Sequence, residues 1–322
     1  MSKPPSIASL PPAHRTLPPM SASVSLVLVM KNERKNIGRI FPMVLSQEFD
    51  APVEYIYVDS GSTDGTIEFM RAQGVEAIVI PPEEFHHGRT RNLAASHAKN
   101  DVIVFLSGDA APTSTRWLSN LVRHFDDPKV GAVYGRQIPP EGMGAMRRHA
   151  LEHEYPAEGF VRDITAAVRI HPGLFRFSNA NSAVRRELWR QFPYNETVVL
   201  AEDQGMCRDV LMAGYRVIYD PEAAVIHGHE RSLWGEFQFA FENGLSLTRM
   251  RILRNPEIGG EFGYGLQRVR DDLQYFVSNG HFVCAAQSLL VNTAKWLGVQ
   301  LGKRGDELPR AWVRRISPKA RP

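Results

Sequence analysis

Two carboxylates stand where an α/β protein places its chemistry. Asp109 follows the apolar run Val102–Leu106 closely, and Asp59 follows the run Val53–Val58 directly. Such runs are typical of strands buried on both faces of a mostly parallel sheet, and ligands bind outside the carboxyl ends of those strands. A carboxylate at that edge can hold a divalent cation, which neutralises a diphosphate. For Asp109 alone, capping of the next helix is an equally good interpretation.

The loop after Asp59 is dense in small hydroxylic and acidic residues, from Ser60 and Gly61 to Thr66. In this loop Asp59 can accept hydrogen bonds from a base N–H group or from ribose hydroxyls, while the backbone comes close to a ligand at Gly61. The alternative is an ordinary Asx or Ser/Thr turn that caps the next helix. Asn32 and Glu33 form a similar exit loop after the first predicted strand, Ser23–Met30.

The segment Phe85–Asn92 precedes a helical pattern that starts near Leu93, and it suits an anion site. Arg91 offers a planar, forked donor for phosphate. The adjacent His86 and His87 are better explained as part of a polar loop than as two ligands of one ion.

A second group of polar residues follows residue 200. Glu202 and Asp203 open a helical pattern, where acids suit the positive end of the helix dipole, so capping alone would explain them. His227 follows the short predicted strand Ala224–Ile226 and is either a metal ligand or a buried, hydrogen-bonded histidine. Arg208 follows these two acids within the same helical pattern and is a second candidate for binding phosphate.

Strands alternate with helical patterns along most of the chain, which predicts βαβ units around a mostly parallel sheet flanked by helices. Beyond about Arg231 the pattern is helical only, with segments at Ser232–Arg251, Tyr264–Val277 and Val283–Leu301. We therefore expect a Pro-rich disordered leader over 1–21, a catalytic domain over 22–230 and an α-helical region with a basic tail over 231–322. The segment between Gly142 and Phe177 has no clear pattern.

The composition excludes several classes of protein. The 322 residues are 43% apolar and 23% charged with a net charge of +3, which is too weakly basic to indicate a nucleic-acid partner. Two cysteines form no disulfide or metal framework and favour a reducing compartment. No stretch is apolar over the length of a membrane span. The phosphate-binding Gly motifs of dinucleotide enzymes and P-loop proteins are missing.

The order of these motifs resembles a known family. A strand before Lys31-Asn32-Glu33, the stretch VDSGSTDGT, the stretch FHHGRTRNLAA and a strand that ends in SGDAAP look like an inverting family 2 glycosyltransferase of the GT-A fold. The motifs His-Gly-x-x-Arg-Asn and Asp-Ala-x-Pro are similar to those of a rhamnosyltransferase subgroup of this family. The resemblance covers about Ser23 to Gly244.

The resemblance implies a role for each candidate. Asp203 would be the general base, with Glu202 as its partner in the family's acidic pair; Asp109 and His227 would hold Mg²⁺ or Mn²⁺. The nucleotide-sugar donor would lie against Asn32, Glu33, Asp59, Ser60, Gly61, Arg91, Asp109 and Arg208, and the acceptor against Asn179 and Asn181, unless these two asparagines only satisfy backbone groups. The common metal motif Asp-x-Asp has Ala111 in place of its second acid, which puts metal dependence in doubt.

The expected reaction is therefore transfer of a sugar, with a lean towards rhamnose from dTDP-rhamnose, to a saccharide or lipid-linked acceptor in polysaccharide synthesis. We expect a cytoplasmic protein, at the inner face of the membrane if it is attached. Basic residues and tryptophan beside apolar helices suit either peripheral membrane contact or a homodimer. Three alternatives are a sugar-nucleotide pyrophosphorylase, a non-catalytic sugar-binding relative and a membrane adaptor. The first lacks its Gly-rich loop after the first strand. The pair Glu202-Asp203 argues against the second, and the third leaves Asp59, Asp109 and Asp203 unexplained.

Overall fold

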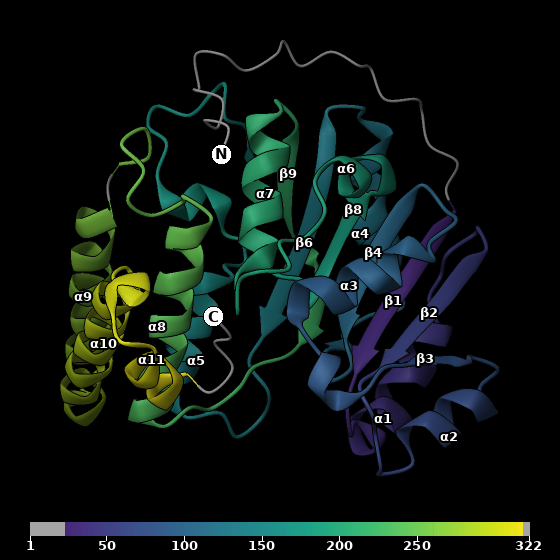
Figure 1. The fold of residues 1–322 in the computed structure, drawn as a ribbon, viewed down its shortest axis with the longest axis horizontal. Coiled ribbons are helices and arrows are strands. Elements are labelled where there is room, and N and C mark those ends of the chain that lie inside the picture. The colour runs from purple at the N-terminus through teal and green to yellow at the C-terminus, as the bar shows by residue number, and fades with distance from the viewer. Residues whose placement is uncertain (1–22, 260, 318–322) are drawn as a thin grey trace.

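The computed structural model describes residues 23–259 and 261–317, and the predicted leader lies outside them. These residues form one nine-stranded sheet with helices on both faces and a group of C-terminal helices to one side (Figure 1). The strand order is β3-β2-β1-β4-β8-β6-β9-β5, and β7 pairs with β9. The expected α/β architecture is confirmed.

The first half of the sheet is parallel. It consists of β1 (Val24–Met30), β2 (Val53–Asp59), β3 (Ala77–Val79) and β4 (Val102–Ser107). In register, Met30 lies opposite Asp59 and Val29 lies opposite Ser107. The loops that carry Asn32, Asp59 and Asp109 therefore leave the sheet at one edge.

The second half is mixed, because β8 (Asn181–Arg185) runs antiparallel to both β4 and β6 (Val130–Ile138). The long strand β9 (Arg216–Ile226) is parallel to β6 and pairs with β5 (Ala111–Pro112) and β7 (Phe160–Arg162). The sequence pattern predicts separate short strands at Val217–Tyr219 and Ala224–Ile226; instead, one continuous strand runs through both, with irregularities in the β6–β9 register.

The central strand β4 is almost entirely apolar because it contributes to two cores. Ile103 and Phe105 of β4 join a core under α3 (His87–Ser96), α6 (Arg186–Gln191) and α7 (Glu202–Met212). Their neighbours Val104 and Leu106 join a second core under α1 (Arg34–Leu45), α2 (Thr66–Ala72) and α4 (Trp117–Val122). Alternating strand residues face opposite sides, so both sets are buried.

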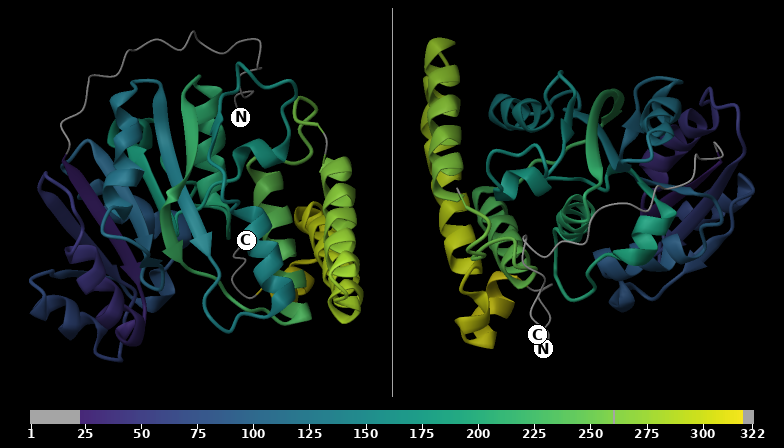
Figure 2. Two further views of the ribbon diagram at one scale, coloured as in Figure 1. Left: turned by 180° about the vertical axis from the view of Figure 1, so that it is seen from behind. Right: turned by 90° about the horizontal axis from the view of Figure 1, so that it is seen from above.

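Five helices lie outside these layers: α5 (Ala145–Glu154), α8 (Leu233–Arg249), α9 (Glu261–Ser278), α10 (Phe282–Gly302) and α11 (Arg310–Ile316). Figures 1 and 2 show α9 and α10 on the outer side of α8, away from the sheet. Within the described ranges, no helix combines the length and the apolar character that a membrane crossing needs.

Glycines set the contact between α8 and α10. A Cβ atom at Gly298 would lie 2.5 Å from the Phe237 carbonyl oxygen, and one at Gly302 would approach the Phe241 carbonyl even more closely. Gly244 of α8 lies in the same way against Val299. Larger side chains at these positions would separate the two helices, so α10 is held firmly against α8.

Candidate active site

Three side chains from two loops converge on one point at the carboxyl edge of the sheet. Asp109 lies in the turn after β4, and His227 and His229 follow β9. His227 Nε2 is 3.5 Å from Asp109 Oδ1, and His229 Nε2 is 3.4 Å from Asp109 Oδ2. The three ligand atoms all lie within 4.8 Å of one another. This arrangement brings together the two predicted metal ligands, and a third that the sequence analysis missed.

His229 had a recognisable signal, the His-x-His spacing after a strand. In extended chain, residues i and i+2 point to the same side, so both imidazoles can reach one ion. Burial lowers the pKa of His229, and the charge of His227 acts in the same direction, which favours the neutral form that binds metals. His229 was not predicted, because only His227 lies at the position that the family resemblance implies for a metal ligand.

Gln137 on β6 orients the His227 ring. Its amide nitrogen donates to Tyr155 Oη at 2.8 Å and to Ser178 Oγ at 2.9 Å, so its Oε1 accepts from His227 Nδ1 at 2.7 Å. This contact holds the ring so that Nε2 faces Asp109. Support of this kind, through the second ring nitrogen, is typical of metal-binding histidines.

The turn that carries Asp109 is tightly packed. A Cβ atom at Gly108 would lie 2.5 Å from the Met30 side chain and 3.1 Å from Glu33 Cγ. Glu33 is thereby held beside Asp109. Burial raises the pKa of Glu33, and the charge of Asp109 acts in the same direction. Burial alone would raise the pKa of Asp109 too, but the contact with His227 and the charge of His229 bring it below its usual value. Asp109 therefore remains ionised.

Ala111 occupies the position of the second acid in the Asp-x-Asp motif, and it does not face this cluster. It lies on β5 opposite Ile226, and its side chain is buried in the apolar core with Ala110. An acid at position 111 would therefore not be a ligand in this structure. In the described part of the chain, the side chains that join Asp109 in a possible ligand group are His227 and His229.

A second group forms at the start of α7. Arg91 of α3 donates to Glu202 Oε1 at 2.5 Å, and both side chains are largely buried. The fork predicted to bind phosphate is therefore engaged with the acidic pair. Asp203, the next residue, accepts from the backbone N–H groups of Asn179 at 3.2 Å and of Gln204 at 2.8 Å. These contacts connect α3, the start of β8 and α7 around one carboxylate.

The surroundings of Asp203 favour proton uptake. Burial raises the pKa of Asp203 to about 7, and the charge of Glu202 acts in the same direction, against the opposing effect of Arg91. A carboxyl group whose pKa lies near neutrality is well matched to general-base catalysis. This is the electrostatic setting that the predicted role of Asp203 requires.

The loops after β1 and β2 hold each other in shape. Asn32 donates its backbone N–H to Ser62 Oγ at 2.8 Å and accepts from Thr63 N–H at 2.9 Å. The fully buried Asp59 carboxylate accepts from Ser62 N–H at 2.6 Å, from Ser62 Oγ at 2.7 Å and from the Tyr57 hydroxyl. The turn interpretation of Asp59 therefore describes its contacts, and its contact with a nucleotide stays a prediction.

Ser60 and Gly61 complete this loop. The Ser60 hydroxyl is buried without a hydrogen-bond partner, which is unusual for a polar group and marks a position for a ligand or a water molecule. Gly61 has a φ of +78°, and a Cβ atom there would lie 2.8 Å from Pro82 Cγ. Only glycine satisfies both requirements without strain.

The two candidate acceptor residues differ. Asn179 lies beside Asp203, and its Oδ1 accepts from Ser182 and Tyr194, while its Nδ2 is buried without a partner. Asn181 is fully buried, accepts from Trp117 Nε1 at 2.8 Å and donates to the Ala223 carbonyl at 2.7 Å. Asn181 thus satisfies internal groups, the second of the two roles considered for it.

Arg208 is not brought to the other candidates. Its guanidinium donates to Asp209 and to the carbonyl of Met250, where α8 ends. These contacts tie α7 to α8 and, in the described part of the chain, involve none of the other candidate residues. The structure therefore gives Arg208 a packing role.

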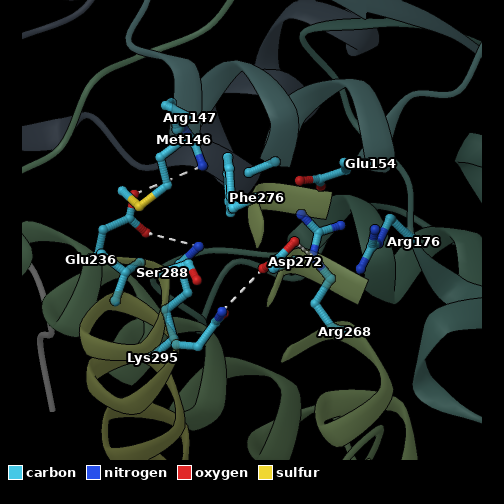
Figure 3. Close-up of a pocket in the computed structure, with 13 residues that line it drawn as sticks. Met146, Arg147, Glu154, Arg176, Glu236, Arg268, Asp272, Phe276, Ser288 and Lys295 are labelled. Atoms are coloured by element: carbon cyan, nitrogen blue, oxygen red, sulfur yellow. Dashed lines mark hydrogen bonds and ion pairs between the residues drawn. The ribbon is translucent and has the colours of Figure 1, made fainter. Parts of the chain in front are cut away.

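A charged cavity of about 180 Å³ lies between α5 and the C-terminal helices (Figure 3). Figure 3 shows acidic and basic side chains from different helices pointing toward one another, and Glu236 is paired with Lys295 at 3.4 Å. Arg147, which lines the cavity, also donates to the His229 carbonyl at 3.0 Å. The cavity therefore adjoins the Asp109 cluster. Its lining residues are Met146, Arg147, Ala150, Glu154, Arg176, Glu236, Arg268, Asp272, Phe276, Ser288, Val291, Asn292 and Lys295.

Among proteins of known structure, the fold is similar to a mannosyltransferase from Pyrobaculum calidifontis solved in complex with GDP-Man and Mn²⁺. The TM-score is 0.54 at 20% identity, over 92% of this chain and 84% of that one. Residues 1–349 of TarS from S. aureus, solved in complex with UDP-GlcNAc, match with a TM-score of 0.51 at 14% identity, over 88% and 92% of the two chains. These similarities support the fold.

Sequence comparison reaches further. An O-antigen chain rhamnosyltransferase of Salmonella typhimurium is 32% identical over 288 residues, which are 88% of this chain and 91% of the relative. One from Salmonella anatum is 32% identical over 273 residues, or 84% and 86% of the two chains. The family model Glycosyl transferase family 2 matches residues 25–192, the part that carries Asp59, Arg91 and Asp109. Because the family model covers just over half of the chain and both relatives are 32% identical over most of their length, the chain belongs to glycosyltransferase family 2 and is a nucleotide-sugar glycosyltransferase.

Proposed function

We propose that this glycosyltransferase moves rhamnose from dTDP-rhamnose to a hydroxyl group of a saccharide or lipid-linked saccharide, as a step of O-antigen polysaccharide synthesis. The observation that carries the proposal is the 32% identity to two O-antigen rhamnosyltransferases over most of both chains. The reaction would take place at the cytoplasmic side of a membrane, where nucleotide sugars are made available to lipid-linked acceptors.

Transfer with inversion needs one base on the acceptor side and no enzyme nucleophile. Asp203 would take the proton of the acceptor hydroxyl, because its raised pKa makes it a competent base near neutral pH. Glu202 would assist this base. Arg91 holds the Glu202 carboxylate in place, and the charge of Glu202 raises the pKa of Asp203. Asn179, whose backbone N–H holds Asp203, has a free amide nitrogen beside it for the acceptor.

The donor would lie along the edge formed by the loops after β1, β2 and β4. The unpartnered Ser60 hydroxyl and the close backbone at Gly61 suit the nucleoside, while Asn32, Glu33 and Asp59 keep the two loops in register. Since Arg91 is engaged with Glu202 and Arg208 with Asp209, neutralisation of the diphosphate would fall mainly to a cation.

Asp109, His227 and His229 would hold that cation. One carboxylate oxygen and two imidazole nitrogens form a donor set that suits Mn²⁺ better than Mg²⁺, which prefers oxygen ligands. Three protein ligands leave coordination positions open for diphosphate oxygens. When bound, the ion would act as a Lewis acid that stabilises the departing nucleoside diphosphate.

A donor panel tests the proposal. Purified protein is incubated in Mn²⁺ with dTDP-rhamnose, GDP-mannose, UDP-glucose and UDP-GlcNAc, and release of the nucleoside diphosphate is measured. We expect the highest kcat/KM with dTDP-rhamnose, and with a saccharide acceptor a product whose anomeric configuration is opposite to that of the donor. Faster turnover of another donor would refute the proposed sugar, and retention of configuration would refute the proposed mechanism.

A further inference from the structure

The outward face of α10 carries large apolar side chains along the length of the helix. Between Phe282 and Gly302 the only ionisable side chains are Cys284 and Lys295, and Lys295 points inward to Glu236. The large apolar side chains on the outward face have exposed fractions between 45% and 71%. They are Phe282, Val283, Leu289, Leu290, Trp296 and Leu297.

The opposite side of the helix is packed against protein. Gly298 and Gly302 lie against α8, and Ala285 and Ser288 are buried as well. Surface helices normally carry polar residues on the side away from the core, and a helix that is apolar all round is normally covered on all sides. The exposed side of α10 therefore carries no charged side chain, and Gln287 and Thr293 are its exposed polar residues among many large apolar ones.

Helix α9 extends this surface. Leu266, Leu273 and Val277 recur at intervals of seven and four residues, so they lie on one side of the helix. Together with Val269, Arg270 and Gln274 they line a shallow groove that opens to solvent. Two neighbouring helices thus both expose several large apolar side chains, more than isolated exposed residues would give.

Basic residues follow at the C-terminal end of this surface. Arg304 lies just beyond α10, and Arg310, Arg314 and Arg315 are exposed on α11. The acids nearby are already neutralised: Asp306 is paired with Arg249 at 2.7 Å and Glu307 with Arg254 at 2.9 Å. The region therefore presents an excess of positive charge next to apolar side chains.

We propose that the outward face of α9 and α10, with the basic residues of α11, docks on the surface of an anionic phospholipid bilayer. Apolar side chains and tryptophan would enter the boundary between head groups and acyl chains, and the arginines would contact the anionic head groups. The helices would lie in the plane of the membrane. This contact would hold the catalytic domain close to lipid-linked acceptors.

Charge complementarity favours a membrane over a second copy of the chain. In a two-fold contact each copy offers the same surface to its partner, so the arginines would need acids on that same surface. Asp306 and Glu307 already pair with Arg249 and Arg254, so arginines of a second copy would have to compete with these ion pairs. Anionic lipid supplies the missing negative charge without any change in these ion pairs.

The test uses the full-length protein and sedimentation with vesicles of phosphatidylcholine alone, or of equal parts phosphatidylcholine and phosphatidylglycerol. The key variant carries Leu290→Asp and Leu297→Asp, two exposed positions on the outward face. A matched control carries Val161→Asp and Val168→Asp, which are also exposed apolar positions but lie outside the C-terminal helices. Thermal unfolding and release of dTDP from donor confirm that each variant is folded and active.

We expect wild type and control to sediment with the anionic vesicles at low salt, and binding to weaken as salt is added. The Leu290→Asp, Leu297→Asp variant should lose at least about tenfold in its partition coefficient, because two leucines no longer enter the bilayer. A variant with Arg310→Gln, Arg314→Gln and Arg315→Gln should bind more weakly and depend less on salt.

Absence of wild-type binding to anionic vesicles would overturn the proposal, as would equal binding by the leucine variant. A wild-type dimer that becomes monomeric in the leucine variant, without vesicle binding, would assign the face to a second copy instead. Because dTDP release is measured in parallel, failure of the membrane contact is distinguished from failure of the proposed rhamnosyl transfer.

Discussion

Arg91 and Glu202 form a largely buried ion pair across 111 residues of sequence, with Nη1 and Oε1 2.5 Å apart. The pair joins the N-terminal half of the sheet, through α3, to the start of α7. It also fixes the charge of Glu202 next to Asp203. The charge of Glu202 raises the pKa of Asp203, and the charge of Arg91 lowers it. A change in the position of Arg91 should therefore change the pKa of the proposed base, Asp203.

Replacement of the base should abolish transfer without loss of the fold. Asp203→Asn keeps the size of the side chain and its acceptor oxygen but removes the basic site. We expect kcat to fall at least about a hundredfold while donor affinity, measured by calorimetry, stays unchanged. Glu202→Gln should cost less in kcat. If both variants retain wild-type turnover, the proposed mechanism is wrong; if only Glu202→Gln is inactive, the roles within the pair are reversed.

The raised pKa of Asp203 predicts the pH dependence of activity. Since the base must be ionised, kcat/KM should increase from pH 5.5 towards a plateau above the pKa of about 7. The pH profile of donor turnover checks this. A profile that is flat between pH 5.5 and 8 would exclude a base with this pKa.

The same shift has a consequence for stability. A carboxyl group whose pKa is higher in the folded than in the unfolded state binds protons more tightly when folded, so its contribution is present at low pH and is lost as the pH rises through the folded pKa. Asp203→Asn does not ionise and avoids this loss. The Tm of the variant should therefore exceed that of wild type by an amount that grows between pH 4 and pH 7. A difference that shrinks over this range would contradict the predicted sign.

Removal of Arg91 should affect both stability and the base. Arg91→Gln leaves the buried Glu202 without its cation, which we expect to cost about 3–5 kcal/mol of unfolding free energy. It also removes a charge that lowers the pKa of Asp203, so the residual activity should require higher pH. Arg89→Gln is the matched control, because Arg89 is exposed and its contact with Glu196 is 3.9 Å long. Equal effects of the two substitutions would argue against this role of Arg91.

The metal-type cluster predicts that all three ligands matter. Asp109→Asn, His227→Ala and His229→Ala should each weaken binding of dTDP in Mn²⁺ and have much less effect in chelator, with the largest loss for Asp109→Asn because it removes a charge. Mn²⁺ should bind more tightly than Mg²⁺. His97→Ala, at an exposed position directly after α3, is the control. If dTDP binding falls equally in metal and in chelator, Asp109 has a structural role.

Asn181 should behave as a structural residue. Asn181→Ala leaves Trp117 Nε1 and the Ala223 carbonyl buried without partners, and we expect a loss of about 2–4 kcal/mol in the free energy of unfolding. The KM for acceptor should not change. A normal stability combined with a raised acceptor KM would instead support the acceptor contact considered from the sequence.

Local patterns were enough to predict the buried strands β1, β2 and β4, the family resemblance and the position of Asp59, Asp109 and Glu202-Asp203 at element ends, since apolar runs mark buried strands and chemistry follows where those runs stop. The sequence also predicted Asp109 and His227 as a pair. Only the tertiary structure decided which polar groups meet: His229 joins Asp109, Arg91 binds Glu202, and Asn181 turns inward to Trp117. Side-chain partners up to 111 residues apart depend on strand order and helix packing, which no local pattern encodes. Likewise, the apolar pattern of α10 predicted a helix, but only the packing of its Gly298 side on α8 left the other side exposed.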